Sequence, residues 1–360
     1  MMVEKTMKTI LPLDPRLIVQ AQAKLDRLTK PRGSLGRLEE LAAQYVAISG
    51  EESPLCPKAR VLTLAADHGV VVEGVSAYPS SVTAQMVTNF LNGGAAINVL
   101  ARQVGAEVQV VDMGVASHLN HLVGLIDRKI GHGTKNMVLG PAMSRDEAIR
   151  SVEIGIELVE RAFDDGVRVV ATGEMGIGNT TASAAITAVM TGQPIFRITG
   201  RGTGVDDEGL SRKRRVIEQA LRVNDPQAGD AFDVLCKVGG FEIGGLVGVI
   251  LGGAACRIPV VLDGFIAGAA ALLAVTLAPT CREYLIASHQ SAEDGHQVVL
   301  EHLGLHPLLD LQLRLGEGTG ACLAIGLLQS SLLLMTQMAT FDGAGVDQSV
   351  TSDPDDPEAT

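Results

Sequence analysis

Several residue types are scarce or scattered in this chain of 360 residues, and each shortage excludes a class of protein. The five cysteines form no CxxC pair, which excludes a thiolate zinc site and a disulfide framework and favours a reducing cytoplasm. Lysine and arginine number 29 against 41 acidic residues, and the net charge of -12 argues against nucleic acid or an anionic membrane as the main partner. The eight histidines are scattered, so the sequence predicts no metal site. The expected substrate is a small molecule.

Export and membrane insertion are also disfavoured. The first residues, MMVEKTMKTILPLDP, lack the apolar core of a signal peptide, and a cytoplasmic location is expected. Residues 318–341 carry no charge over a length that could span a bilayer. Polar residues interrupt this run, and no basic cluster or aromatic belt flanks it. A buried helix is therefore favoured there, with a transmembrane helix as the alternative.

A unit of short apolar run, glycine-bearing turn and longer helical pattern recurs along the middle of the chain. The expected strands are 59–69, 106–114, 167–174, 258–265 and 282–290. The expected helices between them are 84–104, 144–164, 179–191 and 208–223. Nearly continuous apolar strands are typical of a sheet covered on both faces, and the alternation indicates parallel pairing with right-handed crossovers. The sequence predicts a Rossmann-like α/β fold, a parallel sheet flanked by helices.

The two ends of the chain have a helical pattern instead. Ser34 is the expected N-cap of the helix that follows it. The predicted division is a small helical domain, an α/β catalytic domain and an acidic tail that is expected to be disordered. Their ranges are 1–58 with 320–346, then 59–319, then 347–360.

Ionisable or polar side chains stand where the expected strands end. They are Asp67, His68, Asp112, Glu174, Asp263, Ser288 and His289. Ligands of open parallel sheets bind outside the carboxyl ends of the strands, so several of these groups are expected to converge on one cleft. Capping of the next helix is the alternative for most of the acids, and it is favoured for Asp112. For His68, a hydrogen-bonded turn residue is favoured over a metal ligand.

The glycine-rich turn GEMGIGNTTAS, residues 173–183, has the outline of a phosphate loop. However, Asn179 stands where a P-loop has lysine, and the dinucleotide pattern GxGxxG does not fit. Glu174 would repel a phosphate in close contact, so Gly176 and its neighbours are expected to approach a sugar or a ring. A plain tight turn between strand and helix is the alternative.

A second loop, TGRGTGVDD at 199–207, is the better phosphate cradle. The loop residues with this role are Gly200, Gly202, Thr203 and Gly204. Their backbone N–H groups and Lys213 in the following helix can together neutralise a monophosphate. The RKRR run at 212–215 could instead be a nucleic-acid or targeting patch, or a solvated helix face paired with the acids before it.

A third loop, LRLGEGTGA at 313–321, holds a single acid, Glu317, between two glycines. The glycines would let a substrate ring approach, and Leu313 and Leu315 would desolvate the carboxylate and raise its pKa. These features suit a general base, although GEG also forms ordinary turns.

Taken together, these blocks resemble the nicotinate-nucleotide:dimethylbenzimidazole phosphoribosyltransferases. The matching blocks are KPRGSLGRLEELA, GVSAYPSSVTAQMV, GGAAINVLARQ, GTKNM, GEMGIGNTT, GRGTG, SHQSAEDGH and LGEGTGA. They occur in order from about residue 14 to 345. The resemblance implies transfer of ribose phosphate from nicotinate mononucleotide to 5,6-dimethylbenzimidazole, giving α-ribazole 5'-phosphate and nicotinate for the lower ligand of cobalamin.

The resemblance also implies a role for individual residues. Glu317 is the expected general base, and Glu174 and Lys213 belong to the same active site. The expected substrate-binding residues are Ser80, Gln85, Gly176, Gly202, Thr203, Gly204, Asp263, Ser291 and Leu315. Of these, Gly202, Thr203, Gly204 and Ser291 would hold the phosphate, whereas Ser80, Gln85 and Leu315 would line the benzimidazole slot.

Reaction with inversion at C1', no cofactor and a homodimer are implied as well. Small residues at 239–275 would let helices pack closely in such a dimer. A nucleotide sensor that uses the same loops without turnover is the alternative function.

Overall fold

The structure, a computed structural model, describes residues 2–54, 56–119 and 121–347. The predicted acidic tail lies outside these residues, apart from Asp347. The chain forms two compact units. One contains residues up to 13 together with 57–326, and the other contains 14–56 together with the residues from 327 onward.

The larger unit is built on a six-stranded parallel sheet. Its strands are β1 (Ala59–Ala66), β2 (Glu107–Gly114), β3 (Ile126–Asp127), β4 (Val169–Met175), β5 (Val260–Leu262) and β6 (Leu285–Ala287). Their order is β3-β2-β1-β4-β5-β6, and every pair is parallel. The predicted Rossmann-like α/β fold is therefore confirmed. β3 was not predicted, because two residues are too short to give an apolar pattern.

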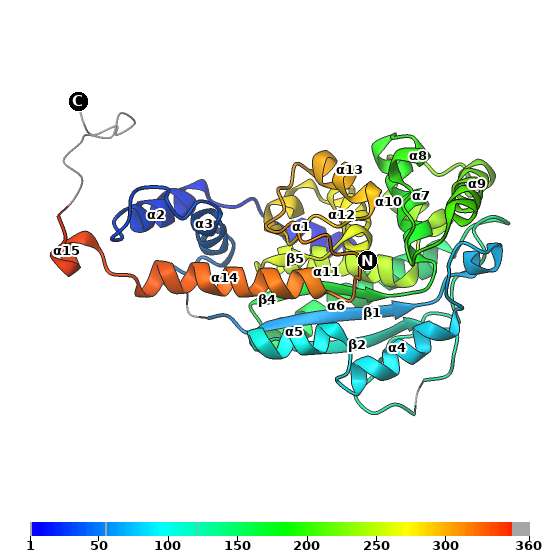
Figure 1. Cartoon of the computed structure of the whole chain (residues 1–360), viewed down its shortest axis with the longest axis horizontal. Helices are drawn as coiled ribbons and strands as arrows, with labels where there is room; N and C mark the ends of the chain where they lie inside the picture. The colour runs from blue at the N-terminus through cyan, green and yellow to red at the C-terminus, as the bar shows by residue number, and fades with distance from the viewer. Residues whose placement is uncertain (1, 55, 120, 348–360) are drawn as a thin grey trace. The chain divides into compact units, whose positions relative to one another are not determined.

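Helices cover both faces of this sheet (Figure 1). The helices of this unit include α1 (Met2–Thr9), α4 (Ser81–Leu91), α5 (Ala96–Val104), α6 (Arg145–Asp164), α7 (Asn179–Thr191), α8 (Ile195–Ile198), α9 (Asp207–Asn224), α10 (Ala231–Val238), α11 (Phe241–Ala255), α12 (Phe265–Leu277) and α13 (Asp294–Leu303), some of which pack on other helices and not on the sheet. Two 3-10 helices, η1 (Gly69–Glu73) and η2 (Pro279–Tyr284), complete the unit. Right-handed crossovers place α4 and α5 on one face, and α6, α11 and α12 on the other.

One expected helix, 84–104, was wrong because it is two helices. Gly93 has a left-handed backbone, with φ of +74°, and ends α4. The side chain of Asn98 then accepts the Ala95 N–H at 3.1 Å and starts α5. The break turns the chain between two short helices and leaves α4 beside the carboxyl ends of the strands.

The small residues of α11 pack against α6 inside the larger unit. A Cβ on Gly155 of α6 would lie 2.0 Å from the Gly245 carbonyl oxygen of α11. Since α11 is buried over Phe241–Ala254, its glycines serve close packing within one chain. The expected use of residues 239–275 in a dimer has no support from this packing.

The smaller unit is helical and joins the two ends of the chain. It contains α2 (Pro15–Asp26), α3 (Arg37–Ser49), α15 (Phe341–Ala344) and the later part of α14 (Thr319–Gln337). The Thr29 N–H donates to the Ala339 carbonyl at 2.9 Å. A buried ion pair joins Lys30 Nζ to Glu39 Oε1 at 2.8 Å.

Three expectations for the chain ends differ from the structure. Residues 2–13 belong to the unit with the sheet, and the later boundary falls at 326 instead of 319. Ser34 is not the N-cap of α3. That position is Gly36, because Glu39 in the first turn accepts the Leu35 N–H instead.

Helix α14 is the one described helix long and apolar enough to cross a membrane. In its most apolar 18-residue window, 56% of the residues are buried inside the protein. This burial favours the buried helix over the transmembrane alternative.

Candidate active site

A cavity of about 520 Å³ opens at the carboxyl ends of β4, β5 and β6. The strands β1 and β4 are neighbours in the sheet, but the chain continues from β1 to β2 on one side and from β4 to β5 on the other. The space between the carboxyl ends of β1 and β4 is therefore a topological switch point, where α/β sheets bind ligands. Eight predicted site residues line the cavity: Glu174, Gly176, Gly202, Thr203, Asp263, Ser291, Leu315 and Glu317. Four others do not line it: Ser80, Gln85, Gly204 and Lys213.

Glu174, near the end of β4, is a buried acid surrounded by other acids. Burial and the charges of Asp263, Glu242 and Glu317 together raise its pKa to about 8. The side-chain amide of Asn179 donates to Glu174 Oε2, which favours the ionised form. Asn179, in the position of a P-loop lysine, therefore orients an acid.

Asp263 follows β5 and fixes the start of α14. Its Oδ1 accepts the N–H groups of Gly320 at 2.8 Å and Ala321 at 3.0 Å, and its Oδ2 accepts that of Gly318 at 3.1 Å. Burial raises the pKa of Asp263 to about 7, although these three bonds favour its ionised form. The acid thus joins the end of β5 to the turn that carries Glu317.

Glu317 is a buried acid with a free acceptor atom. Its carboxylate oxygen Oε2 has no hydrogen-bond partner among the described residues, and the residue is 5% exposed. Burial raises its pKa, while the Ile97 backbone N–H lowers it. The backbone has a φ of +66°, and the Glu317 carbonyl accepts the Thr63 hydroxyl of β1 at 3.3 Å. This is the arrangement expected of a proton acceptor.

The predicted desolvation of Glu317 by Leu313 and Leu315 has limited support. Leu315 is 57% exposed, and Leu313 is half-buried. The glycines serve contacts within the protein, since a Cβ at Gly316 would lie 2.2 Å from Glu174 Oε1. Gly176 does line the cavity, yet its Cβ would also lie 2.4 Å from the Ala66 carbonyl oxygen behind it.

Lys213 lies beneath the GRGTG loop. Its Nζ donates to Thr180 Oγ1 at 2.9 Å and to the Gly200 carbonyl at 3.3 Å. Burial lowers the pKa of Lys213 to about 8, against the charge of Glu293. The ammonium group lies close to Gly202, since a Cβ there would be 3.0 Å from Nζ. The loop therefore has a cation behind it.

The arginines of the basic helix face differ in their surroundings. Arg212 lies 3.0 Å from Glu208 one turn earlier. Arg214 donates to the Phe196 carbonyl at 3.3 Å, while its Nε is buried without a partner among the described residues, and Arg215 is exposed.

In the GRGTG loop itself, Thr203 Oγ1 accepts the Ala77 N–H at 3.1 Å and lies 3.2 Å from Ser76 Oγ. Thr203 therefore connects the GRGTG loop to the segment before α4.

Two residues after β6 extend the cavity wall. His289 Nδ1 lies 2.9 Å from Ser288 Oγ, and burial lowers the pKa of His289. Ser291 Oγ donates to the Leu313 carbonyl at 3.1 Å and accepts the Glu293 N–H at 3.3 Å.

Among the other strand-end residues, Asp112 lies outside the cavity, accepts the Val115 N–H at 2.8 Å and pairs with Lys129. These contacts agree with the structural role that was favoured for Asp112 over a role in the cleft.

Sequence reasoning missed several cavity residues. They include Tyr78, Val82, Met86, Thr180, Phe265 and Arg314. Val82 and Met86 are one helical turn apart on α4, a spacing that could have identified them. The Arg314 guanidinium donates to the Gly202 carbonyl at 3.2 Å, a contact between segments distant in sequence.

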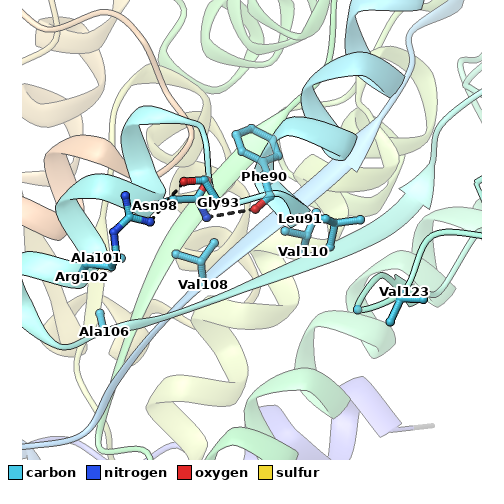
Figure 2. A pocket seen from close by; sticks show the side chains of 11 residues that line it. Phe90, Leu91, Gly93, Asn98, Ala101, Arg102, Ala106, Val108, Val110 and Val123 are labelled. Carbon is cyan, nitrogen blue, oxygen red and sulfur yellow. Dashed lines mark hydrogen bonds between the residues drawn. The ribbon is translucent and has the colours of Figure 1, made fainter.

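A second cavity, of about 350 Å³, lies between α4, α5 and β2 (Figure 2). Its polar side chains are already used: Asn98 donates to the Phe90 carbonyl at 3.0 Å, and Arg102 donates to the Gly93 carbonyl at 3.1 Å. No acid is among the described residues that line it. The cavity at the carboxyl ends is therefore the candidate active site.

In the described part of the chain, no group of three His, Cys, Asp or Glu side chains could hold a metal ion.

Comparison with known proteins gives a consistent picture. A family model described as "Phosphoribosyltransferase" matches residues 10–346. The chain is 58% identical over 345 residues to a protein of Roseiflexus sp. (strain RS-1), covering 96% of this chain and 98% of that one. It is 56% identical over 344 residues to a protein of Geobacter metallireducens, with coverage of 96% and 98%. Both relatives are named nicotinate-nucleotide--dimethylbenzimidazole phosphoribosyltransferase.

The fold is similar to a solved structure of an enzyme with the same function in its name, from Thermus thermophilus. The TM-score is 0.88 at 47% identity, with 94% of this chain and 100% of that chain covered.

Proposed function

The chain belongs to the nicotinate-nucleotide:dimethylbenzimidazole phosphoribosyltransferase family, and we propose that it transfers ribose 5-phosphate from nicotinate mononucleotide to 5,6-dimethylbenzimidazole. The products are α-ribazole 5'-phosphate and nicotinate, and the reaction belongs to assembly of the lower ligand of cobalamin. The observation that carries the proposal is the free Oε2 of Glu317, a buried carboxylate oxygen on the cavity wall.

Glu317 is proposed as the general base. One ring nitrogen of the benzimidazole attacks C1' with its lone pair, and the bond from C1' to the pyridinium nitrogen breaks. The electron pair of that bond neutralises the pyridinium as nicotinate leaves. The other ring nitrogen then gives its proton to Glu317. Attack from the face opposite to the leaving group inverts C1'.

The other buried acids suit the charge that develops in this reaction. As the bond to nicotinate lengthens, positive charge spreads over C1' and the ring oxygen of the ribose. Glu174 and Asp263 line the cavity with Glu317, and in their ionised forms such acids, fixed in a site of low dielectric, stabilise this cation. We therefore place Glu174 with Glu317 in the catalytic set.

The phosphate is assigned to the GRGTG loop. Gly202, Thr203 and Arg314 line the cavity, Lys213 lies behind the loop, and Arg314 donates to the Gly202 carbonyl. Ser291 is placed as a further contact. Gly204 does not line the cavity, so its role is limited to the conformation of the loop, where its φ is +104°.

The acceptor slot is assigned to apolar side chains that line the cavity. They are Tyr78, Val82, Met86 and Leu315. Ser80 is half-buried and Gln85 is exposed on α4, and neither lines the cavity. Their expected contact with the acceptor rests on the resemblance alone.

A homodimer that uses no metal or redox cofactor is proposed from the resemblance as well. A cytoplasmic location is proposed from the scattered cysteines. The catalytic domain is proposed to be the unit that carries the sheet, and the helical domain is the smaller unit. Light scattering after size exclusion tests the dimer, which requires twice the chain mass of 37.6 kDa.

The test of the function is turnover with both substrates. Purified protein incubated with nicotinate mononucleotide and 5,6-dimethylbenzimidazole should release nicotinate and α-ribazole 5'-phosphate in equal amounts. Nicotinate mononucleotide alone should give no comparable release. A protein that binds the nucleotide but forms neither product would contradict the proposal and support the sensor.

A further inference from the structure

One buried pair, His68 with Glu242, is not used in the mechanism above. His68 follows β1, and Glu242 lies in the first turn of α11. His68 Nε2 lies 2.6 Å from Glu242 Oε1, and the two side chains are 1% and 0% exposed. The other carboxylate oxygen, Glu242 Oε2, has no hydrogen-bond partner in the described ranges. Neither residue lines the cavity.

The pair lies directly behind the cavity wall. A Cβ at Gly176 would lie 3.3 Å from Glu242 Oε1 and 3.5 Å from His68 Cδ2. Gly176 itself lines the cavity, two residues after Glu174. The charge of Glu242 acts on Glu174 and disfavours its ionisation. The charge state of the pair therefore influences the ionisation of Glu174 in the active site.

The groups that face His68 are mostly acidic. Glu242 comes from α11, and Asp67 comes from the end of β1, where it accepts the Ala116 N–H at 2.8 Å. Burial disfavours the imidazolium, but the charges of Glu242 and Asp67 and the hydrogen bond from His68 to Glu242 favour it, and the pKa of His68 is raised. An uncompensated carboxylate at this depth would be costly, since buried charges are generally paired.

We infer that His68 is a positioning residue whose imidazolium offsets the charge of Glu242 behind the Gly176 wall and thereby sets the protonation of Glu174. The inference rests on the proposed function. With the imidazolium present, Glu242 adds little negative potential at Glu174. With a neutral residue at position 68, Glu174 faces the full charge of Glu242 and keeps its proton to higher pH.

A double-mutant cycle separates compensation of charge from a purely structural contact. The variants are His68→Gln, Glu242→Gln and the double variant, and the readout is the pH profile of kcat/KM. The limb that belongs to Glu174 is identified by its loss in Glu174→Gln. Its midpoint should rise by about one pH unit in His68→Gln and stay near the wild-type value in Glu242→Gln, where the buried His68 loses its anionic partner and becomes neutral. In the double variant, which has a neutral pair, it should return near the wild-type value.

Two results would overturn the inference. The first is a midpoint that is the same in the wild type and all three variants. The second is a double variant whose loss of kcat/KM is at least the sum of the two single losses, without a shift of the midpoint. Either result would mean that the pair acts only as a packing contact.

Nitrogen NMR of the unliganded, histidine-labelled protein keeps the test independent of turnover and of the folding of His68→Gln. The His68 signal should titrate above the ordinary 6.5 in the wild type and at lower pH in Glu242→Gln. Equal midpoints in these two proteins would overturn the inference. Absence of nicotinate release from the wild type would instead contradict the proposed function, and the NMR titration would still decide the charge of the pair.

Discussion

The side chain of Asn179 donates a hydrogen bond to the carboxylate of Glu174, five residues earlier in the same turn. A turn with the outline of a phosphate loop is thus built around an acid. Glu174 is buried beside Asp263 and Glu317, so its ionised form destabilises the folded protein. The proposed chemistry nevertheless uses that ionised form.

Glu174→Gln should stabilise the protein at alkaline pH. The pKa of Glu174 is about 8 in the fold and 4.5 without it, so its contribution to stability is fully present below pH 4.5 and is lost as pH rises through 8. The variant should gain on the order of 4 kcal/mol over the wild type at pH 8 and little at pH 4.5. Denaturant unfolding at both values measures this. Glu218→Gln, on an exposed part of α9, is the control and should change stability at neither value. An equal gain at both pH values would contradict the assignment.

Glu317→Gln should bind nicotinate mononucleotide normally but transfer ribose phosphate about 10² to 10⁴-fold more slowly, the usual contribution of a general base. Calorimetry gives the first quantity, and nicotinate release gives the second. Glutamine keeps the size of the side chain, so a folding defect is not expected. A rate near that of the wild type would remove Glu317 from the role of base.

Lys213→Met should raise KM for nicotinate mononucleotide about ten- to a hundredfold, which is the contribution of a hydrogen bond to a charged group. The pKa of Lys213 is about 8, so the ammonium is present below that value and is lost above it. KM of the wild type should therefore increase between pH 7 and pH 9, and that of the variant should change less.

Lys237→Met is the matched control for this change. Lys237 pairs with Asp233 on α10 and does not line the cavity. The Lys237→Met variant should have the same KM for nicotinate mononucleotide as the wild type. If both lysine variants raise KM equally, the effect is one of overall charge and not of the phosphate site.

Asp263→Asn should impair Glu317 through α14. The asparagine amide group would face the N–H of Gly318 and leave it without an acceptor, at a cost of about 1–3 kcal/mol. Because Glu317 precedes these donors in the chain, a displaced helix start should lower kcat by about tenfold or more. Thermal melting and turnover are both needed.

Asp230→Asn separates the two effects. Asp230 accepts the N–H groups of Phe232 and Asp233 at the start of α10, outside the cavity. This variant should lose some stability and keep kcat. An equal loss of kcat in both aspartate variants would mean that Asp263 acts only on folding.

The sequence predicted the order and type of most elements, because apolar runs and turn residues are local signals. The ends of strands were predicted less well. The run at 258–265 forms a strand only over Val260–Leu262, because Asp263 leaves the sheet to accept backbone N–H groups more than fifty residues later. Such a partner has no local signal in the sequence.

The candidate site shows the same difference between local and distant contacts. Glu317 could be identified from its glycine-flanked motif, but its burial depends on Thr63 of β1 and the Ile97 backbone, which are far away in the chain. Arg314 was overlooked because its contact with Gly202 joins two loops. Ser80 and Gln85 were placed by motif alone, and adjacent residues of a helix point in different directions: Met86 lines the cavity, whereas Gln85 is exposed.

The three bonds that Asp263 accepts come from main-chain nitrogens, so they place no demand on side chains. They depend instead on the number of residues between Glu317 and α14. One inserted residue would rotate the start of the helix by about 100° and carry these donors away from the acid. Relatives of this chain should therefore differ freely in many side chains of α14 while keeping the spacing from residue 317 to residue 321 constant.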